Sequence, residues 1–172
     1  MHLLYNYNEN IVKYDLINKF NYKYLSKIPK FKSLTLSFKL KRYDIKNLIS
    51  GLAALEILTL QKPVLSYSKI STISLKIRKG QPVGCKITLR QKNFKRFLYL
   101  LINNLSLTQN KIENTKKNVS GSLTIRNILV FDILEKNYQF FKNLSDLNIN
   151  LTTTDCNNKE LIFLLKSNKF IL

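Results

Sequence analysis

Histidine, cysteine and tryptophan are the scarcest residues of this 172-residue chain, and their scarcity excludes several kinds of site. The chain has one histidine, His2, two cysteines and no tryptophan. A single histidine near a terminus excludes a His-based catalytic triad and most metal centres. Cys85 and Cys156 are far apart in the sequence, so they form neither a disulfide framework nor a paired metal-ligand motif. We therefore expect two reduced thiols, no metal ion and no cofactor.

Acidic residues are also few, and the middle of the chain has none. Lysine and arginine total 29 against 10 aspartates and glutamates, which gives a formal net charge of +19. Residues 57–112 hold eleven basic side chains and no acidic one. This interval therefore has no carboxylates for the metal ions of a nuclease, and its run RKGQPVG does not end in the Gly-Lys-Ser/Thr of a Walker loop.

A charge of this size repels itself unless a polyanion neutralises it, and nucleic acid is the commonest such partner. The acid-free middle third is the expected contact surface. An anionic membrane surface is the alternative partner, and a merely solubilising lysine-rich surface is the alternative without a partner.

Long hydrophobic runs are missing too. No stretch approaches the roughly 18 apolar residues that a membrane span needs. The hydrophobic residues, 45% of the chain, occur in short periodic runs, which predicts a single domain over residues 1–172 with one sizeable core. The first 16 residues contain acids and no arginine, unlike a transit peptide. Abundant Lys, Asn, Ile, Phe, Tyr and Leu indicate an AT-rich genome such as that of an organelle.

Apolar periodicity predicts an α+β fold: an antiparallel sheet with helices packed on one face, the other face free, and one long basic loop. Residues 106–121 are polar and are expected to form a loop. Helices are expected at 9–21, after Asp44, after Asn93 and after Asn157 or Asn158, and strands at 31–40, 64–67, 83–90, 122–134 and 147–153.

The segment 68–90 combines the long basic loop with an orderly strand. Gly80, Pro82 and Gly84 punctuate the loop. Alternation from Val83 to Arg90 then places Val83, Cys85, Ile87 and Leu89 on one face and Gly84, Lys86, Thr88 and Arg90 on the other. The second face carries hydroxyl and basic groups, which suits contacts to phosphate and ribose.

At QKPVLSYSKISTISLKIRKGQPVGCKITLR, residues 61–90, the chain resembles the large-subunit ribosomal protein five family without a gap. FNYKYLSKIPKFKSLTLS (20–37) and LNINLTTTDCNNKELIFLLKSNKF (147–170) also resemble that family and keep its order. The resemblance implies an antiparallel sheet with helices. It also implies a structural protein that binds 5S rRNA, or other large-subunit rRNA, in the central protuberance.

The resemblance also implies RNA-contacting residues on the sheet and beside it. The family's contacts fall on Ser37, Gln61, Thr88 and Arg90, and Lys62 and Lys86 lie beside them in the same motifs. Ser37 departs from the family, because a hydroxyl replaces an asparagine amide of longer reach.

The family's loop before Gly-x-Pro approaches the P-site tRNA, and in this chain it falls on residues 68–82. The expected tRNA-facing residues are Lys69, Ser71, Lys76, Arg78 and Lys79. Lys69 stands where the family usually has arginine, so a bidentate contact is lost, and Ile70 stands where it usually has lysine.

Other departures concern the setting of the protein. The Gly-Val-Gly turn after the first strand is replaced by SFKLKR, and the Pro-Arg-Ile-Arg-Asp-Phe-Arg motif by LTQNKIENTKKN. Such drift, with the AT-rich composition, indicates an organelle-encoded protein of a mitochondrial ribosome. Some mitochondrial ribosomes lack 5S rRNA. Neighbouring central-protuberance proteins and, across an intersubunit bridge, a small-subunit head protein are the expected protein partners, with no membrane contact.

Two alternatives to a structural rRNA-binding protein come from other classes. An RNA-processing enzyme on an α+β frame would need a carboxylate cluster facing the basic sheet, which the sequence does not offer. A membrane-surface protein would need a broad lipid-facing stripe. Residues 92–106 come closest, but their apolar stripe suits packing against the sheet.

Overall fold

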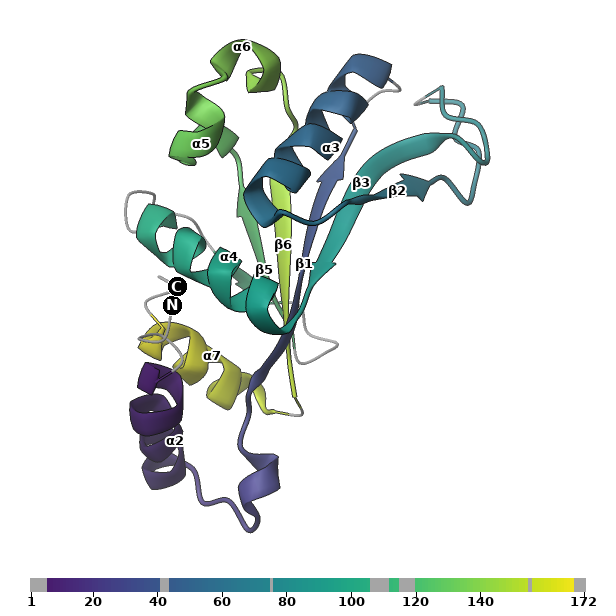
Figure 1. Ribbon diagram of the computed structural model, residues 1–172. Coiled ribbons are helices and arrows are strands. Elements are labelled where there is room, and N and C mark those ends of the chain that lie inside the picture. The colour runs from purple at the N-terminus through teal and green to yellow at the C-terminus, as the bar shows by residue number, and fades with distance from the viewer. Residues whose placement is uncertain are drawn as a thin grey trace. The chain divides into compact units, whose positions relative to one another are not determined.

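Helices and strands are interspersed along the chain in the computed structural model, which describes residues 6–40, 44–74, 76–105, 112–114, 120–154 and 156–168 (Figure 1). The fold is therefore α+β, as expected. The strands are β1 (Phe31–Lys39), β2 (Val64–Tyr67), β3 (Pro82–Leu89), β4 (Ile112–Asn114), β5 (Ser120–Ile125) and β6 (Leu147–Thr153). The helices are η1 (Asn8–Val12), α2 (Lys13–Lys19), η2 (Leu25–Lys27), α3 (Ile45–Thr59), α4 (Gln91–Leu105), η3 (Ile128–Val130), α5 (Asp132–Glu135), α6 (Tyr138–Phe141) and α7 (Asn158–Ser167).

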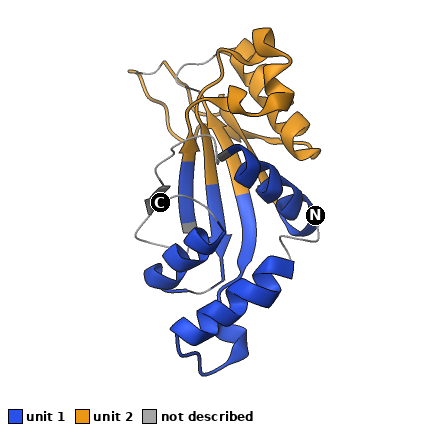
Figure 2. Cartoon of the chain, turned by 90° about the vertical axis from the view of Figure 1, so that its left-hand side faces the viewer, with its two compact units in different colours: residues 1–34, 90–123, 150–172 blue, residues 35–89, 124–149 orange. Residues whose placement is uncertain are grey.

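The six strands form one sheet in the order β2-β3-β1-β6-β5-β4, and the pairs β2–β3 and β4–β5 are antiparallel. The chain divides into two compact units (Figure 2). Unit 1 comprises residues 1–34, 90–123 and 150–172, and unit 2 comprises residues 35–89 and 124–149. Strands β1, β5 and β6 each contribute residues to both. A single domain over residues 1–172 stays a prediction.

Unit 2 is built on the inward side chains of β1 and β3. Leu36 and Phe38 on β1 and Cys85, Ile87 and Leu89 on β3 are each at most 3% exposed. Helix α3 packs on this face, where a Cβ added at Gly51 would lie 3.2 Å from Cys85 Sγ and 3.6 Å from the Phe38 ring. The helix begins as predicted, because the Asp44 carboxylate accepts a hydrogen bond from the Lys46 N–H at 3.0 Å.

Unit 1 has a core cluster formed by η1, α2, the segment after η2, and α7. Val12, Leu16, Ile28 and Leu164 are each at most 3% exposed. Helix α7 begins in a capping box in which the Glu160 carboxylate accepts from the Asn157 N–H at 2.9 Å. Of the two caps predicted, Asn157 and Asn158, the structure has Asn157.

Three expectations about local structure are wrong. The strand expected over 122–134 ends at Ile125, because the Asn127 side chain accepts from the Leu129 N–H at 3.1 Å and starts the 3-10 turn η3, which α5 follows. Helix α4 begins at Gln91 rather than after an Asn93 cap. Pro82 and Gly84 lie within β3 and not in the loop, although Gly84 was also expected on the strand from Val83.

One other expectation holds with a change, and one is wrong for the residues that the structure describes. The helix expected over 9–21 is present, but its first turn is the π-helical η1. Within the loop expected over 106–121, the described residues form β4 and the start of β5, and the rest of that interval lies outside the described residues.

Candidate nucleic-acid interface

The face of the unit 2 sheet opposite α3 is polar and basic. Along β1, half-buried Thr35 and Ser37 and exposed Lys39 alternate with the buried residues. Along β3, exposed Lys86 and Thr88 alternate with Cys85, Ile87 and Leu89. Side chains two residues apart on a strand share one face of the sheet. The sequence pattern therefore folds into a surface of hydroxyl and ammonium groups.

A groove of about 440 Å³ runs over this polar face. Its polar lining comes from Thr35, Ser37, Lys39, Ser66 and Lys86, and Phe38, Leu40, Ile77, Val83 and Gly84 complete it. Two of these lining residues are lysines and none is acidic. Hydroxyl and ammonium groups around a groove without a carboxylate can donate hydrogen bonds to phosphate and ribose oxygens.

Gly84 allows β1 and β3 to approach closely beneath this groove. A Cβ atom at position 84 would collide with the carbonyl oxygen of Phe38. The Leu40 N–H donates to the Val83 carbonyl at 2.9 Å, which continues the pairing beyond the end of β1. Glycine at position 84 is thus required by packing rather than by a turn.

The long basic loop is a hydrogen-bonded hairpin that extends β2 and β3. At its base, the Ser68 N–H donates to the Gln81 carbonyl at 2.8 Å and the Gly80 N–H to the Ser68 carbonyl at 3.0 Å. Nearer the tip, Thr72 and Ile77 exchange backbone bonds of 2.9 and 3.1 Å. Figure 1 shows this segment extending beyond the β2–β3 ribbon.

Nearly the whole described hairpin is exposed, and Ile77 fixes it to unit 2. Ile77 is 8% exposed and lines the groove, whereas Ile73 at the tip is 95% exposed. All five predicted tRNA-facing residues are exposed: Lys69, Ser71, Lys76, Arg78 and Lys79. The hairpin therefore presents its basic side chains to solvent, while the buried Ile77 holds it against the rest of unit 2.

The predicted RNA-contacting residues fall into two sets. Ser37 and Lys86 line the groove, and Thr88 shares the face of Lys86. Gln61 and Lys62 lie in the connection between α3 and β2, outside the groove lining. Arg90 is exposed directly after β3 and belongs to unit 1.

Thr35, Lys39 and Ser66 line the groove as well, and none of the three was predicted as a site residue. The alternation along residues 31–40 could have indicated Thr35 and Lys39, since they share the face of Ser37. Ser66 pairs with Gly84 in the β2–β3 register, and no local sequence pattern fixes that pairing.

Metal-binding clusters and membrane-spanning helices are not found in the part of the chain that the structure describes. No group of three or more histidine, cysteine or acidic residues there could hold a metal ion. No helix among the described residues has the length and apolar character needed to cross a membrane. Burial raises the pKa of the Cys85 thiol to about 11, which marks it as a packing residue rather than a nucleophile.

Comparison with known proteins identifies the family. No family model matches the chain. The large ribosomal subunit protein uL5 of Blochmanniella floridana is 33% identical over 98% of this chain and 92% of its own length. The uL5m protein of Reclinomonas americana is 34% identical over 96% of this chain and 94% of its own. The chain belongs to the uL5 family of large ribosomal subunit proteins.

This membership decides between the function classes left open by the sequence. The uL5 proteins are structural ribosomal proteins rather than enzymes, so an RNA-processing enzyme is excluded. The uL5 protein of Nitrosomonas eutropha, 32% identical over 97% of this chain, is about as similar as the mitochondrial form. Similarity to relatives therefore does not choose between a bacterial and an organellar setting.

Proposed function

We propose that this uL5-family chain is a structural constituent of the large ribosomal subunit that binds rRNA through the polar face of β1 and β3. The groove carries the proposal, because it combines Thr35, Ser37, Lys39, Ser66 and Lys86 without a carboxylate. Lysines neutralise phosphates, and the hydroxyls reach phosphate and ribose oxygens. Thr88, on the same face as Lys86, extends this surface along β3.

The RNA partner in this proposal is 5S rRNA or another segment of large-subunit rRNA in the central protuberance. Gln61, Lys62 and Arg90, which lie outside the groove lining, add contacts from the segments before β2 and after β3. The mitochondrial ribosome is the proposed location, supported by the AT-rich composition of the chain.

The hairpin has a second role in this proposal, which is to approach the P-site tRNA. Its basic side chains are exposed at Lys69, Lys76, Arg78 and Lys79, and no acidic residue occurs between residues 57 and 112. The hairpin is held by its own hydrogen bonds and by Ile77, so its order does not depend on the tRNA. A preordered segment with basic and no acidic side chains suits a polyanion that binds and dissociates repeatedly.

Cosedimentation tests the proposal. An epitope-tagged chain expressed in its own cell should migrate with large ribosomal subunits in a sucrose gradient, and should stay with them after the two subunits separate at low magnesium. Recovery at the top of the gradient, away from the large subunit, would contradict the proposed function.

A further inference from the structure

Unit 1 contains a groove of about 300 Å³ with an apolar floor. Helices α2, α4 and α7 and the segment after η2 all contribute to it. The aliphatic floor residues are each at most 4% exposed overall: Val12, Leu16, Ile28, Leu98 and Leu164. Phe31 and Phe94 also line the groove, and their ring centroids lie 6.0 Å apart.

The rim of this groove is basic. Lys13, Lys30, Lys32 and Lys95 line it together with one carboxylate, Glu9. Four ammonium groups against one carboxylate leave a local charge of +3. Such an excess around an apolar floor favours an anionic ligand.

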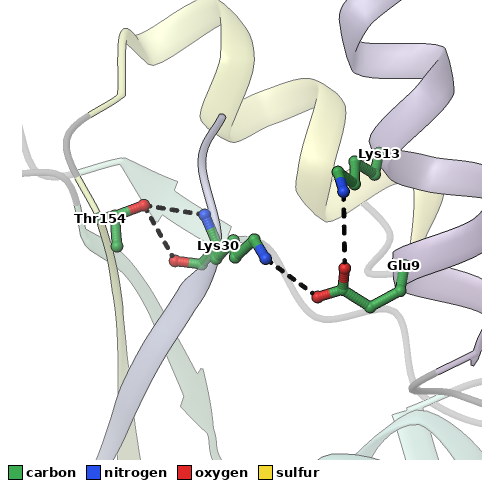
Figure 3. Close-up of polar contacts among 4 residues, drawn as sticks. All are labelled: Glu9, Lys13, Lys30 and Thr154. Carbon is green, nitrogen blue, oxygen red and sulfur yellow. Dashed lines mark hydrogen bonds and ion pairs between the residues drawn. The ribbon is translucent and has the colours of Figure 1, made fainter. Parts of the chain in front are cut away.

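Contacts between distant segments fix part of this rim (Figure 3). Glu9 Oε1 lies 3.1 Å from Lys30 Nζ, and Glu9 Oε2 lies 4.0 Å from Lys13 Nζ. The Lys30 N–H donates to Thr154 Oγ1 at 2.9 Å, and the Thr154 N–H donates to the Lys30 carbonyl at 2.9 Å. Lys30 is thereby held at its backbone by Thr154, directly after β6, and at its side chain by Glu9 on η1, so this part of the rim is ordered without a ligand.

The shape and chemistry of the groove select the ligand. Its volume is at the lower end for small-molecule sites, which suits a single nucleotide rather than a duplex. The rings of Phe31 and Phe94 and the aliphatic floor can cover the faces of a base, as apolar and aromatic side chains do for unstacked bases in RNA. The carboxamides of Asn8 and Gln91 also line the groove and carry both donors and acceptors for a base edge.

We propose that this groove holds one unpaired nucleotide of ribosomal RNA, with its base on the apolar floor and its phosphate at Lys32 and Lys95. The inference rests on the proposed function, since it assumes an rRNA partner. It adds a base-binding site in unit 1 to the phosphate- and ribose-binding face of unit 2.

Methyl NMR on the full-length chain tests this inference directly. The methyl signals of Val12, Leu16, Ile28, Leu98 and Leu164 report on the floor. Adenosine monophosphate should shift these signals saturably, and adenosine should shift the same signals with weaker affinity. Inorganic phosphate alone should leave them in place, because it has no group that reaches the floor.

Charge variants distinguish binding of the nucleotide at the rim lysines from non-specific attraction of an anion to a basic protein. The double variant Lys32→Gln, Lys95→Gln should weaken adenosine monophosphate binding by about fivefold or more. Lys159→Gln is the single-charge control, because Lys159 is exposed on α7 of the same unit and does not line the groove. Equal weakening by the control and the double variant would overturn the site.

Two further outcomes would overturn the inference. One is that none of the five methyl signals moves at any adenosine monophosphate concentration up to about ten millimolar. The other is that the acidic peptide acetyl-Glu-Phe-Glu-amide shifts the floor methyls while the nucleotide does not, which would assign the groove to a protein side chain.

The proposed function can be judged independently of this result. If the wild-type chain binds rRNA but adenosine monophosphate does not reach the floor, only the nucleotide site is wrong. If the wild-type chain binds no ribosomal RNA, the proposed function is wrong as well.

Discussion

The carbonyl oxygen of Phe38 on β1 lies in the space that a Cβ atom at Gly84 on β3 would occupy. Because the obstacle is backbone, it cannot move aside like the end of a flexible side chain. We therefore expect Gly84→Ala to force β1 and β3 apart and to lower the free energy of unfolding by about 2–3 kcal/mol. Thermal or urea unfolding measures this loss.

Gly80→Ala is the matched control for this variant. Gly80 has a φ of 84°, but a Cβ added there meets no atom within 4 Å. Only left-handed backbone strain of about 1 kcal/mol is expected. A Gly84→Ala variant no less stable than Gly80→Ala would contradict the close approach.

The hairpin offers a second matched pair, Ile77 and Ile73. Ile77→Ala removes a side chain that is 8% exposed and should cost about 2 kcal/mol, whereas Ile73, 95% exposed, should be replaceable within about 0.5 kcal/mol. Urea unfolding of both variants measures the difference. Equal losses would mean that Ile77 does not anchor the hairpin.

Because Ile73 is so exposed, a crosslinker at position 73 can test whether the hairpin lies close to the tRNA. A photoactivatable amino acid at position 73 should crosslink to P-site tRNA in ribosomes that carry this chain. The same amino acid at Tyr138, 54% exposed on α6, is the comparison. Crosslinking to tRNA from position 138 and not from position 73 would contradict the proposed role of the hairpin.

The two thiols should differ in reactivity. Cys85 is 1% exposed and its pKa is raised by burial to about 11, whereas Cys156 is partly exposed and lies 3.3 Å from Thr153 Oγ1. At pH 8 the folded chain should react with iodoacetamide at Cys156, and Cys85 should react only after unfolding. Mass spectrometry of the alkylated peptides distinguishes the two, and fast labelling of Cys85 in the folded chain would refute its burial.

Tyr22 makes stability depend on pH at the alkaline end. Burial, and then the nearby Glu160 carboxylate, raises the pKa of Tyr22 from 10.0 to about 12. The folded state therefore holds this proton more tightly than the unfolded state. The resulting stability is complete below pH 10 and is lost as the pH rises towards 12.

Urea unfolding between pH 9 and 12 tests this linkage. Tyr22→Phe should flatten the decline in stability above pH 10, although Cys85 contributes its own decline between about 9 and 11. Glu160→Gln, which can still accept from the Asn157 N–H, should lower the Tyr22 pKa measured by absorbance. An identical pH profile for Tyr22→Phe and the wild type would disprove the effect.

Patterns confined to one element predicted structure well in this chain. Alternation gave the two faces of β1, β3 and β6, and the side chains of Asp44 and Asn157 marked the starts of α3 and α7. The positions of Ser37, Lys86 and Thr88 on the polar face followed from the same alternation, because a strand fixes its faces locally.

Features that depend on distant contacts were not predictable in the same way. The alternation predicted that Gly84 lies in a strand, but the reason for a glycine there is the backbone of β1, which is more than forty residues earlier. The rim of the unit 1 groove depends on Glu9 meeting Lys30, and Lys30 meeting Thr154. No periodicity or sequence motif predicts these contacts, because they arise only from tertiary packing.

The salt dependence of rRNA binding tests the central claim most directly. Lys39→Gln and Lys86→Gln each remove one cation from the groove on the polar face, and Lys136→Gln removes an exposed cation outside it. The affinity for a large-subunit rRNA fragment or 5S rRNA should be measured from about 50 to 200 mM salt. Each groove variant should weaken binding and reduce the slope of log affinity against log salt by about one, with Lys136→Gln unchanged. Wild-type slopes in both groove variants would contradict the claim that this face binds the ribosomal RNA.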